Sequence, residues 1–249
     1  MKSYLIGHRG EPECFPENSL AGFRAILDAG ALYIETDVQI TADGVAVLSH
    51  DPTLLKITGH ELVITETDYR TMRELPAGHH DRFGECFRDL HIARLDEFAA
   101  LLQRYPQARA FVELKHASIK ARGAAGVTDL VLAALGDSLS QCIIISFEYE
   151  ALTHVREIGT LPIGWVLPEW SAATRTLAAE LEPEYLFCNR KRLPPESEPL
   201  WQGPWEWVVY TVNEPDEVAA YRARGIGLVE TNVITRLLAG HGPDGLVRG

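Results

Sequence analysis

The stretch LYIETDVQITADGVAVLSHD, residues 32–51, decides the fold because it contains two strand-like apolar runs separated by only four residues. A crossover between parallel strands needs a dozen residues or more. Residues 32–40 and 45–50 are therefore predicted to pair as an antiparallel hairpin, with Asp43 and Gly44 in the turn.

The register of this hairpin predicts which side chains share a face. We place the centre of the turn between residues 42 and 43, which sets His50 opposite Glu35. Cross-strand partners project from the same face, as do residues two apart on one strand. Glu35, Asp37 and His50 are thus expected on one face, and a slip of one residue would turn His50 away.

Strand-like and helix-like runs alternate along the rest of the chain. The strand candidates are 3–8, 32–38, 45–50, 109–115, 142–147, 162–167, 184–188, 206–212 and 227–231. The helical patterns are 19–30, 95–105, 128–136, 148–159, 171–181, 215–225 and 233–240. Because the second hairpin strand is surplus, eight parallel strands remain. In a chain of 249 residues they predict an α/β fold, a TIM-type (β/α)8 barrel.

One segment interrupts this alternation. Residues 52–94 are rich in Gly, His and charge and have no clear period, so we expect an inserted cap near the site, following the second barrel strand. Residues 1–240 would then form a single domain, and 241–249 a frayed tail.

The composition excludes several classes of protein. A formal charge of −12 argues against a nucleic-acid partner, since phosphate binding needs a basic face. The four cysteines form no CxxC pair, the N-terminus does not resemble a signal peptide, and no segment has 18 uninterrupted apolar residues. We expect a cytoplasmic protein without stable membrane association, and we leave open whether it forms a homodimer.

Five polar residues lie at or near the ends of apolar strand-like runs: His8, Glu35, Asp37, His50 and Glu113. An unpaired charge is costly to bury, so strand ends that carry charges should converge and supply each other with partners. Three carboxylates are the hard oxygen ligands that Mg²⁺ or Ca²⁺ prefers. We therefore predict one divalent cation at Glu35, Asp37 and Glu113, with His8 and His50 as acid and base.

Further candidates would contact the substrate. Arg9 follows His8 and suits an anion, since guanidinium binds phosphate oxygens bidentately. Lys115 serves either a phosphate or only charge balance. Trp207 and Asn213 lie in WEWVVYTVN; a tryptophan at strand spacing is more often core, and Asn213 could bind a substrate or hold a loop.

Taken together, these motifs resemble the glycerophosphodiester phosphodiesterases, especially the short cytoplasmic bacterial type. The resemblance rests on HRG (8–10), PENS (16–19), IETDVQITADGVAVLSHD (34–51), ELK (113–115), SFEYEAL (146–152) and YTVN (210–213). It implies a metal-dependent barrel enzyme that hydrolyses glycerophosphodiesters to glycerol 3-phosphate and an alcohol, with the glycerol 2-hydroxyl attacking first.

By motif, the family's metal-binding acids fall on Glu35, Asp37 and Glu113, its catalytic histidines on His8 and His50, and its phosphate contacts on Arg9 and Lys115. We favour His50 as the base and His8 as the acid. The chain has Ser19, Lys56 and Asn232 where members commonly carry Thr, Arg and Asp. Two alternatives are a lysophospholipase-D-type enzyme acting on lipid head groups and a non-catalytic barrel that binds a phosphorylated ligand.

Overall fold

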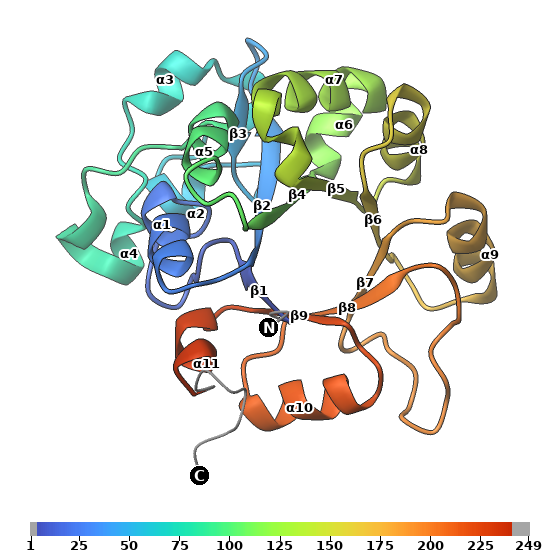
Figure 1. Cartoon of the computed structure of the whole chain (residues 1–249). Coiled ribbons are helices and arrows are strands. Elements are labelled where there is room, and N and C mark those ends of the chain that lie inside the picture. The colour runs from blue at the N-terminus through green and yellow to red at the C-terminus, as the bar shows by residue number, and fades with distance from the viewer. Residues whose placement is uncertain (1–3, 241–249) are drawn as a thin grey trace.

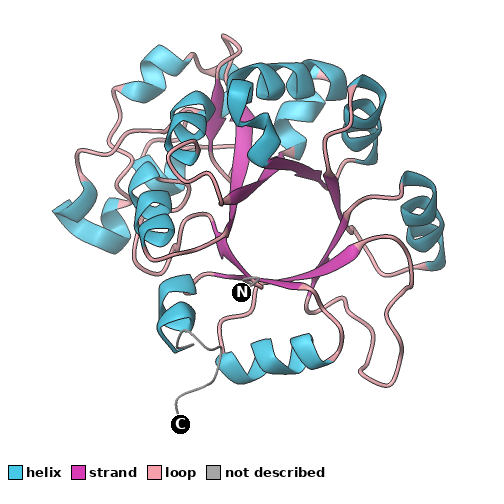
Figure 2. Cartoon of the chain, viewed as in Figure 1, coloured by secondary structure: helices cyan, strands magenta, loops and turns pink. Residues whose placement is uncertain are grey.

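Eight parallel strands close into a barrel, which confirms the predicted TIM-type fold. A computed structural model describes residues 4–240, so the predicted tail at 241–249 lies outside the described residues. The strands follow one another in the order β1-β9-β8-β7-β6-β5-β4-β2, and the pairing of β1 with β2 closes the ring. Figures 1 and 2 show this ring of strands with the helices arranged around its outside.

The strands are β1 (Leu5–His8), β2 (Tyr33–Ile40), β3 (Ala46–Leu48), β4 (Arg109–Leu114), β5 (Cys142–Ser146), β6 (Ile163–Val166), β7 (Tyr185–Asn189), β8 (Glu206–Tyr210) and β9 (Leu228–Thr231). The longer helices are α1 (Leu20–Asp28), α5 (Leu95–Leu102), α6 (His116–Arg122), α7 (Ala124–Leu135), α8 (Tyr149–Ile158), α9 (Ala172–Leu181), α10 (Pro215–Ala223) and α11 (Ile234–Gly240). Each predicted strand and helix is present. Helix α6 was missed by the sequence analysis.

The β2–β3 hairpin is antiparallel, as predicted, but its register differs from the predicted one by one residue. Val38 pairs with Leu48, so the turn is centred on Asp43. The amide of residue 41 donates to the carbonyl of residue 45 at 3.0 Å, and Gly44 has φ +85°. These features describe a three-residue loop with a left-handed glycine, in place of the four-residue loop that the sequence analysis assumed.

Successive side chains along each strand point alternately into the barrel interior and into the layer beneath the helices. On β4, Phe111 belongs to the interior cluster, whereas Ala110 and Val112 pack in the outer layer. The same alternation directs Glu35 and Asp37 of β2 inward, two and four residues after Tyr33. Parallel strands end at the same side of a barrel, so their last inward side chains meet there.

The loop after β1 packs closely against helix α1. Ser19 caps this helix, because its hydroxyl accepts a hydrogen bond from the amide of Gly22 at 3.2 Å. A Cβ atom on Gly22 would lie 2.4 Å from the carbonyl oxygen of Gly10. Gly10 has φ +74°, a conformation that costs glycine little. The two glycines therefore let α1 approach the strand end that carries His8.

The insertion after the hairpin contains only short helices. They are α2 (Leu55–Thr58), η1 (Ile64–Glu66), α3 (Tyr69–Arg73), α4 (His80–Phe83) and η2 (Gly84–Phe87). Leu54, Ile64 and Met72 form a small buried cluster of their own with Val47 of β3. In the part of the chain that the structure describes, no helix is both long and apolar enough to span a membrane.

Candidate active site

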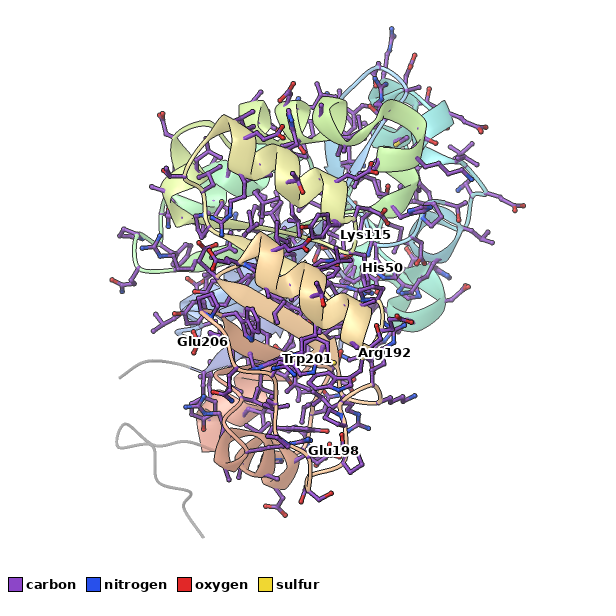
Figure 3. All side chains as sticks on the ribbon, turned by 90° about the vertical axis from the view of Figure 1, so that its right-hand side faces the viewer. His50, Lys115, Arg192, Glu198, Trp201 and Glu206 are labelled. Carbon is purple, nitrogen blue, oxygen red and sulfur yellow. The ribbon has the colours of Figure 1, made fainter. Side chains whose placement is uncertain are left out.

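A cavity of about 230 Å³ opens at the carboxyl-terminal end of the barrel. It is lined by His8, Arg9, His50, Glu113, Lys115, Ile145, Phe147, Val166, Phe187, Asn189, Tyr210, Thr211 and Glu230. Figure 3 shows His50 and Lys115 close together at this end, whereas Glu206, the first residue of β8, lies toward the other end. The cavity therefore contains both predicted histidines and both predicted phosphate contacts.

The three predicted metal ligands converge beside the cavity, which Glu113 lines. Glu35, Asp37 and Glu113 each offer an oxygen, and these atoms lie within 4.8 Å of one another. Glu35 is 2 % exposed, and its buried Oε1 has no hydrogen-bond partner in the described part of the chain. Three converging carboxylates with an unsatisfied oxygen are a donor set that suits a hard divalent cation.

Two basic side chains already bind part of this acidic group. Arg9 Nε lies 3.0 Å from Asp37 Oδ2, and Lys115 Nζ lies 3.1 Å from Asp37 Oδ1 and 2.8 Å from Glu113 Oε1. Although burial alone would raise the pKa of Asp37, these two cations hold it well below its usual range. Glu35 lacks such a pairing, and burial together with the nearby Asp37 raises its pKa. Asp37 is therefore the most firmly ionised of the three acids.

Asn18, which the sequence analysis did not assign, orients Asp37. Its Nδ2 donates to Asp37 Oδ2 at 2.9 Å, and its Oδ1 accepts from the backbone amide of Asp37 at 3.2 Å and the hydroxyl of Thr36 at 2.9 Å. Asn18 adopts φ +57°, a strained conformation that the surrounding contacts stabilise. The PENS motif was the available signal, and its asparagine fixes a predicted metal ligand.

His8 is held between an amide and a carboxyl group. Its Nδ1 donates to Asn232 Oδ1 at 2.6 Å, and its Nε2 lies 3.3 Å from Glu230 Oε1 and 3.9 Å from Glu35 Oε2. Burial and the Arg9 guanidinium lower the pKa of His8 to about 3. A neutral imidazole is suited to accept a proton, so these contacts favour His8 as the base, opposite to the sequence-based assignment.

His50 lines the cavity as predicted, but the strand register that was expected to place it there is not the observed one. In the observed register Asp37 and Ser49 lie opposite each other, with the amide of Ser49 donating to the carbonyl of Asp37 at 3.1 Å. Strict alternation would then turn His50 away, but β3 ends at Leu48 and residue 50 lies in a bend. The predicted pairing of His50 with Glu35 is therefore wrong, while its predicted position at the site is correct.

The carboxylate of Asp51 orients His50. Asp51 Oδ1 lies 2.7 Å from Nδ1 of His50, whose side chain is 34 % exposed. Burial lowers the pKa of His50, while Asp37 and Asp51 act in the opposite direction. A carboxylate on Nδ1 stabilises an imidazolium better than a neutral amide does, so His50 is better placed than His8 to carry a proton.

Glu230 is a further acid in the cavity that the sequence analysis missed. It is 4 % exposed, and burial raises its pKa to about 8. The available signal was a charged residue between Val229 and Thr231 in a strand that reads GLVET. The three predicted metal ligands come from only two strands, β2 and β4, whereas Glu230 lies on β9, which closure of the barrel brings next to β1.

The loop after β1 positions Arg9 and connects it to the insertion. Arg9, Gly10 and Glu11 all have positive φ, so three consecutive residues adopt the left-handed conformation. Nη1 of Arg9 lies 3.7 Å from Glu17 Oε2, which also accepts from Lys56 Nζ at 2.6 Å. Lys56, one of the three departures from the family pattern, thus contacts the site through Glu17.

Two predicted substrate contacts lie elsewhere. Trp207 faces the outer layer of the barrel, where its Nε1 donates to the carbonyl of Trp201 at 3.1 Å, because odd positions of β8 point away from the interior. Asn213 accepts hydrogen bonds from the amide of Asn232 and the hydroxyl of Thr231 and does not line the cavity. Trp207 is a core residue, and Asn213 supports the backbone that presents Asn232.

A closed parallel barrel with acids, histidines and basic groups at the carboxyl ends of its strands is the arrangement of a barrel enzyme. The chain matches the Glycerophosphoryl diester phosphodiesterase family over residues 8–235. The chain belongs to this family, and it is a phosphodiesterase.

Individual relatives agree with this assignment. A glycerophosphodiester phosphodiesterase of Caldanaerobacter subterraneus subsp. tengcongensis is 30% identical over 193 residues, which cover 74% of this chain and 77% of the relative. An Oleispira antarctica phosphodiesterase, solved with the product sn-glycerol-3-phosphate, has a TM-score of 0.83 at 19% identity, with 95% of this chain and 96% of that chain covered. For the Agrobacterium tumefaciens glycerophosphodiester phosphodiesterase the TM-score is 0.75 at 24% identity, with 96% and 100% covered. These two structures share the fold.

Proposed function

We propose that this protein hydrolyses small glycerophosphodiesters to sn-glycerol 3-phosphate and an alcohol, using one divalent cation and two histidines. The convergence of Glu35, Asp37 and Glu113 beside a cavity that holds His8 and His50 supports this proposal most strongly. Glu35, Asp37 and Glu113 would hold Mg²⁺ or Ca²⁺, which when bound supplies positive charge beside the phosphoryl oxygens.

Arg9 and Lys115 would bind the phosphodiester anion. Both line the cavity, and their side chains are mostly buried, at 17 % and 13 % exposed. Charge develops on the equatorial oxygens during phosphoryl transfer, and preorganised cations stabilise it in a site from which water is largely excluded. Their ion pairs with Asp37 hold both nitrogens at the cavity before a substrate enters.

The two histidines would move protons on either side of the phosphorus. Neutral His8 would take the proton of the attacking hydroxyl through Nε2, since Nδ1 is occupied by Asn232. His50, with Asp51 on its Nδ1, would give a proton to the leaving alkoxide. This assignment reverses the roles that we inferred from the sequence.

The test is turnover of glycerophosphocholine by the purified chain, with Mg²⁺, with Ca²⁺ and with EDTA. We expect sn-glycerol 3-phosphate and choline with a cation and no turnover with EDTA. Lysophosphatidylcholine in a parallel assay tests the lysophospholipase-D alternative. Full activity in EDTA would overturn the metal requirement, and faster turnover of the lysolipid would overturn the substrate class.

The remaining predictions belong to the same proposal. A small-molecule substrate suits a cavity of about 230 Å³. We keep the prediction of a cytoplasmic enzyme without stable membrane association or nucleic-acid partner. Its oligomeric state is open to measurement by light scattering.

A further inference from the structure

Two of the four acids around the cavity have no lysine or arginine of the described residues within ion-pair distance. Asp37 and Glu113 form ion pairs with Arg9 or Lys115. Within residues 4–240, neither Glu35 nor Glu230 forms an ion pair with a lysine or arginine, although they are only 2 % and 4 % exposed. A carboxylate buried without a cation is costly, so Glu35 and Glu230 are the two acids that an added cation would stabilise most.

His8 presents a free nitrogen to these two carboxylates. Its Nδ1 donates to Asn232 Oδ1, which leaves the lone pair on Nε2. This nitrogen lies 3.3 Å from Glu230 and 3.9 Å from Glu35, and one ligand atom from each of the three residues lies within 4.8 Å of the others. Among residues 4–240, no group forms a hydrogen bond with Oε1 of Glu35.

We propose that His8, Glu35 and Glu230 form a second cation site, which shares Glu35 with the site at Glu35, Asp37 and Glu113. One imidazole and two carboxylates suit Zn²⁺, whereas Mg²⁺ and Ca²⁺ prefer an all-oxygen set. A metal-binding histidine usually donates its other N–H to an oxygen that fixes its orientation. Asn232 Oδ1 provides that oxygen here.

Zinc at this site inhibits the enzyme. This consequence rests on the proposed function, in which Nε2 of His8 must accept a proton. A bound Zn²⁺ occupies that lone pair, and it also engages Glu35, which the first cation needs. The enzyme would thus be active with Mg²⁺ and lose activity when Zn²⁺ fills the second site.

The binding test is isothermal titration calorimetry with Zn²⁺ in saturating Mg²⁺. Cys14 and Cys86 are exposed free thiols, a group that zinc favours as a ligand, so all variants carry Cys14→Ser and Cys86→Ser. Glu230→Gln should raise the dissociation constant of one equivalent of Zn²⁺ by at least about tenfold. Asn232→Ala should do the same, although it removes only the acceptor for Nδ1 of His8. The matched control is Glu113→Gln, which alters the first site and should keep this equivalent.

Two outcomes would overturn the proposal. One is unchanged zinc binding in folded Glu230→Gln and Asn232→Ala, with folding checked by circular dichroism. The other is loss of the equivalent in Glu113→Gln but not in Glu230→Gln, which would assign zinc to the first site. Calorimetry needs no substrate, so the zinc-binding result can be interpreted even if the protein does not hydrolyse glycerophosphodiesters.

Inhibition is measured on the same variants. Each variant's turnover of glycerophosphocholine is normalised to its own zinc-free rate in Mg²⁺. Zinc should reduce turnover of the reference protein, and Glu230→Gln should need at least about ten times more zinc for the same loss. Equal sensitivity of the two proteins would show that zinc inhibits elsewhere.

Discussion

The barrel interior has an apolar part, here called the floor, which includes Phe111, Phe187 and Leu228. It also has a polar part at the carboxyl ends of the strands, here called the mouth, which includes Glu113 and Glu230. The two parts are built from the same strands, with residues only two positions apart. On β4, Phe111 packs edge-to-face against Phe187, with ring centroids 5.1 Å apart, while Glu113 lines the cavity. On β9, Leu228 belongs to the floor and Glu230 to the mouth. The floor therefore stabilises the fold, and the mouth sacrifices stability to hold charged groups close together.

The strongest test of this contrast is to neutralise a mouth acid. Glu35→Gln removes a carboxyl group whose ionisation is costly in the fold, so at neutral pH it should raise the free energy of unfolding of the metal-free protein by about 1–3 kcal/mol. It should also reduce turnover to the assay background, since a cation ligand is lost. Denaturant unfolding in EDTA and turnover in Mg²⁺ give the two readouts, and a variant that is both active and no more stable would contradict the contrast.

The second test separates the two histidines of the mouth. His8→Ala and His50→Ala should each lower turnover of glycerophosphocholine by about 10²–10⁴-fold. A nitrophenyl phosphodiester has a leaving group that needs no proton, so His50→Ala should recover most of its rate on it and His8→Ala should not. Recovery in His8→Ala alone would restore the assignment made from the sequence, and near-normal activity of both variants would make both residues structural.

The third test is made at the floor. Phe111→Ala should lower the free energy of unfolding by about 3–5 kcal/mol, because a fully buried ring leaves a cavity. The fraction that remains folded should turn over substrate at a rate close to that of the unaltered protein. Thermal unfolding and active-site-normalised rates measure the two effects. A loss of rate comparable to that of the histidine variants would show that floor and mouth are coupled.

The fourth test uses pH. The pKa of Glu230 is raised to about 8 in the fold, so the folded state retains a proton that the unfolded state loses above about pH 4.5. This group therefore makes the metal-free protein less stable as pH rises from about 4.5 to 8, by at most about 1.4 kcal/mol per unit. Glu230→Gln should remove that dependence, so its stability relative to the unaltered protein should increase across this range. If the difference in stability between Glu230→Gln and the unaltered protein were the same at pH 5 and pH 8, the raised pKa of Glu230 would be contradicted.

The smallest effect is expected outside both regions. Trp207→Phe loses the hydrogen bond to Trp201 and should cost about 1 kcal/mol of stability. Because Trp207 faces the outer layer, kcat and KM for glycerophosphocholine should not change. A raised KM with unchanged stability would return Trp207 to the substrate-binding residues.

Much of the site followed from local sequence patterns. Alternation within β2 places Glu35 and Asp37 on one face in any register, and an E-x-D pattern at a strand end needs no knowledge of distant residues. The position of His50 was less secure, because it depended on a loop length. A left-handed Gly44 shortened that loop to three residues and shifted the register.

By itself, the sequence determined the alternation of strands and helices, the hairpin at residues 32–51 and the strand ends that carry charge, because periodicity and turn residues act over a few neighbours. Only the tertiary structure decided which groups meet. His8 and Asn232 are 224 positions apart and come into contact because β9 closes the barrel against β1. Glu230 acquires its raised pKa through the same closure, since a strand end becomes a buried site only when its neighbours are in place.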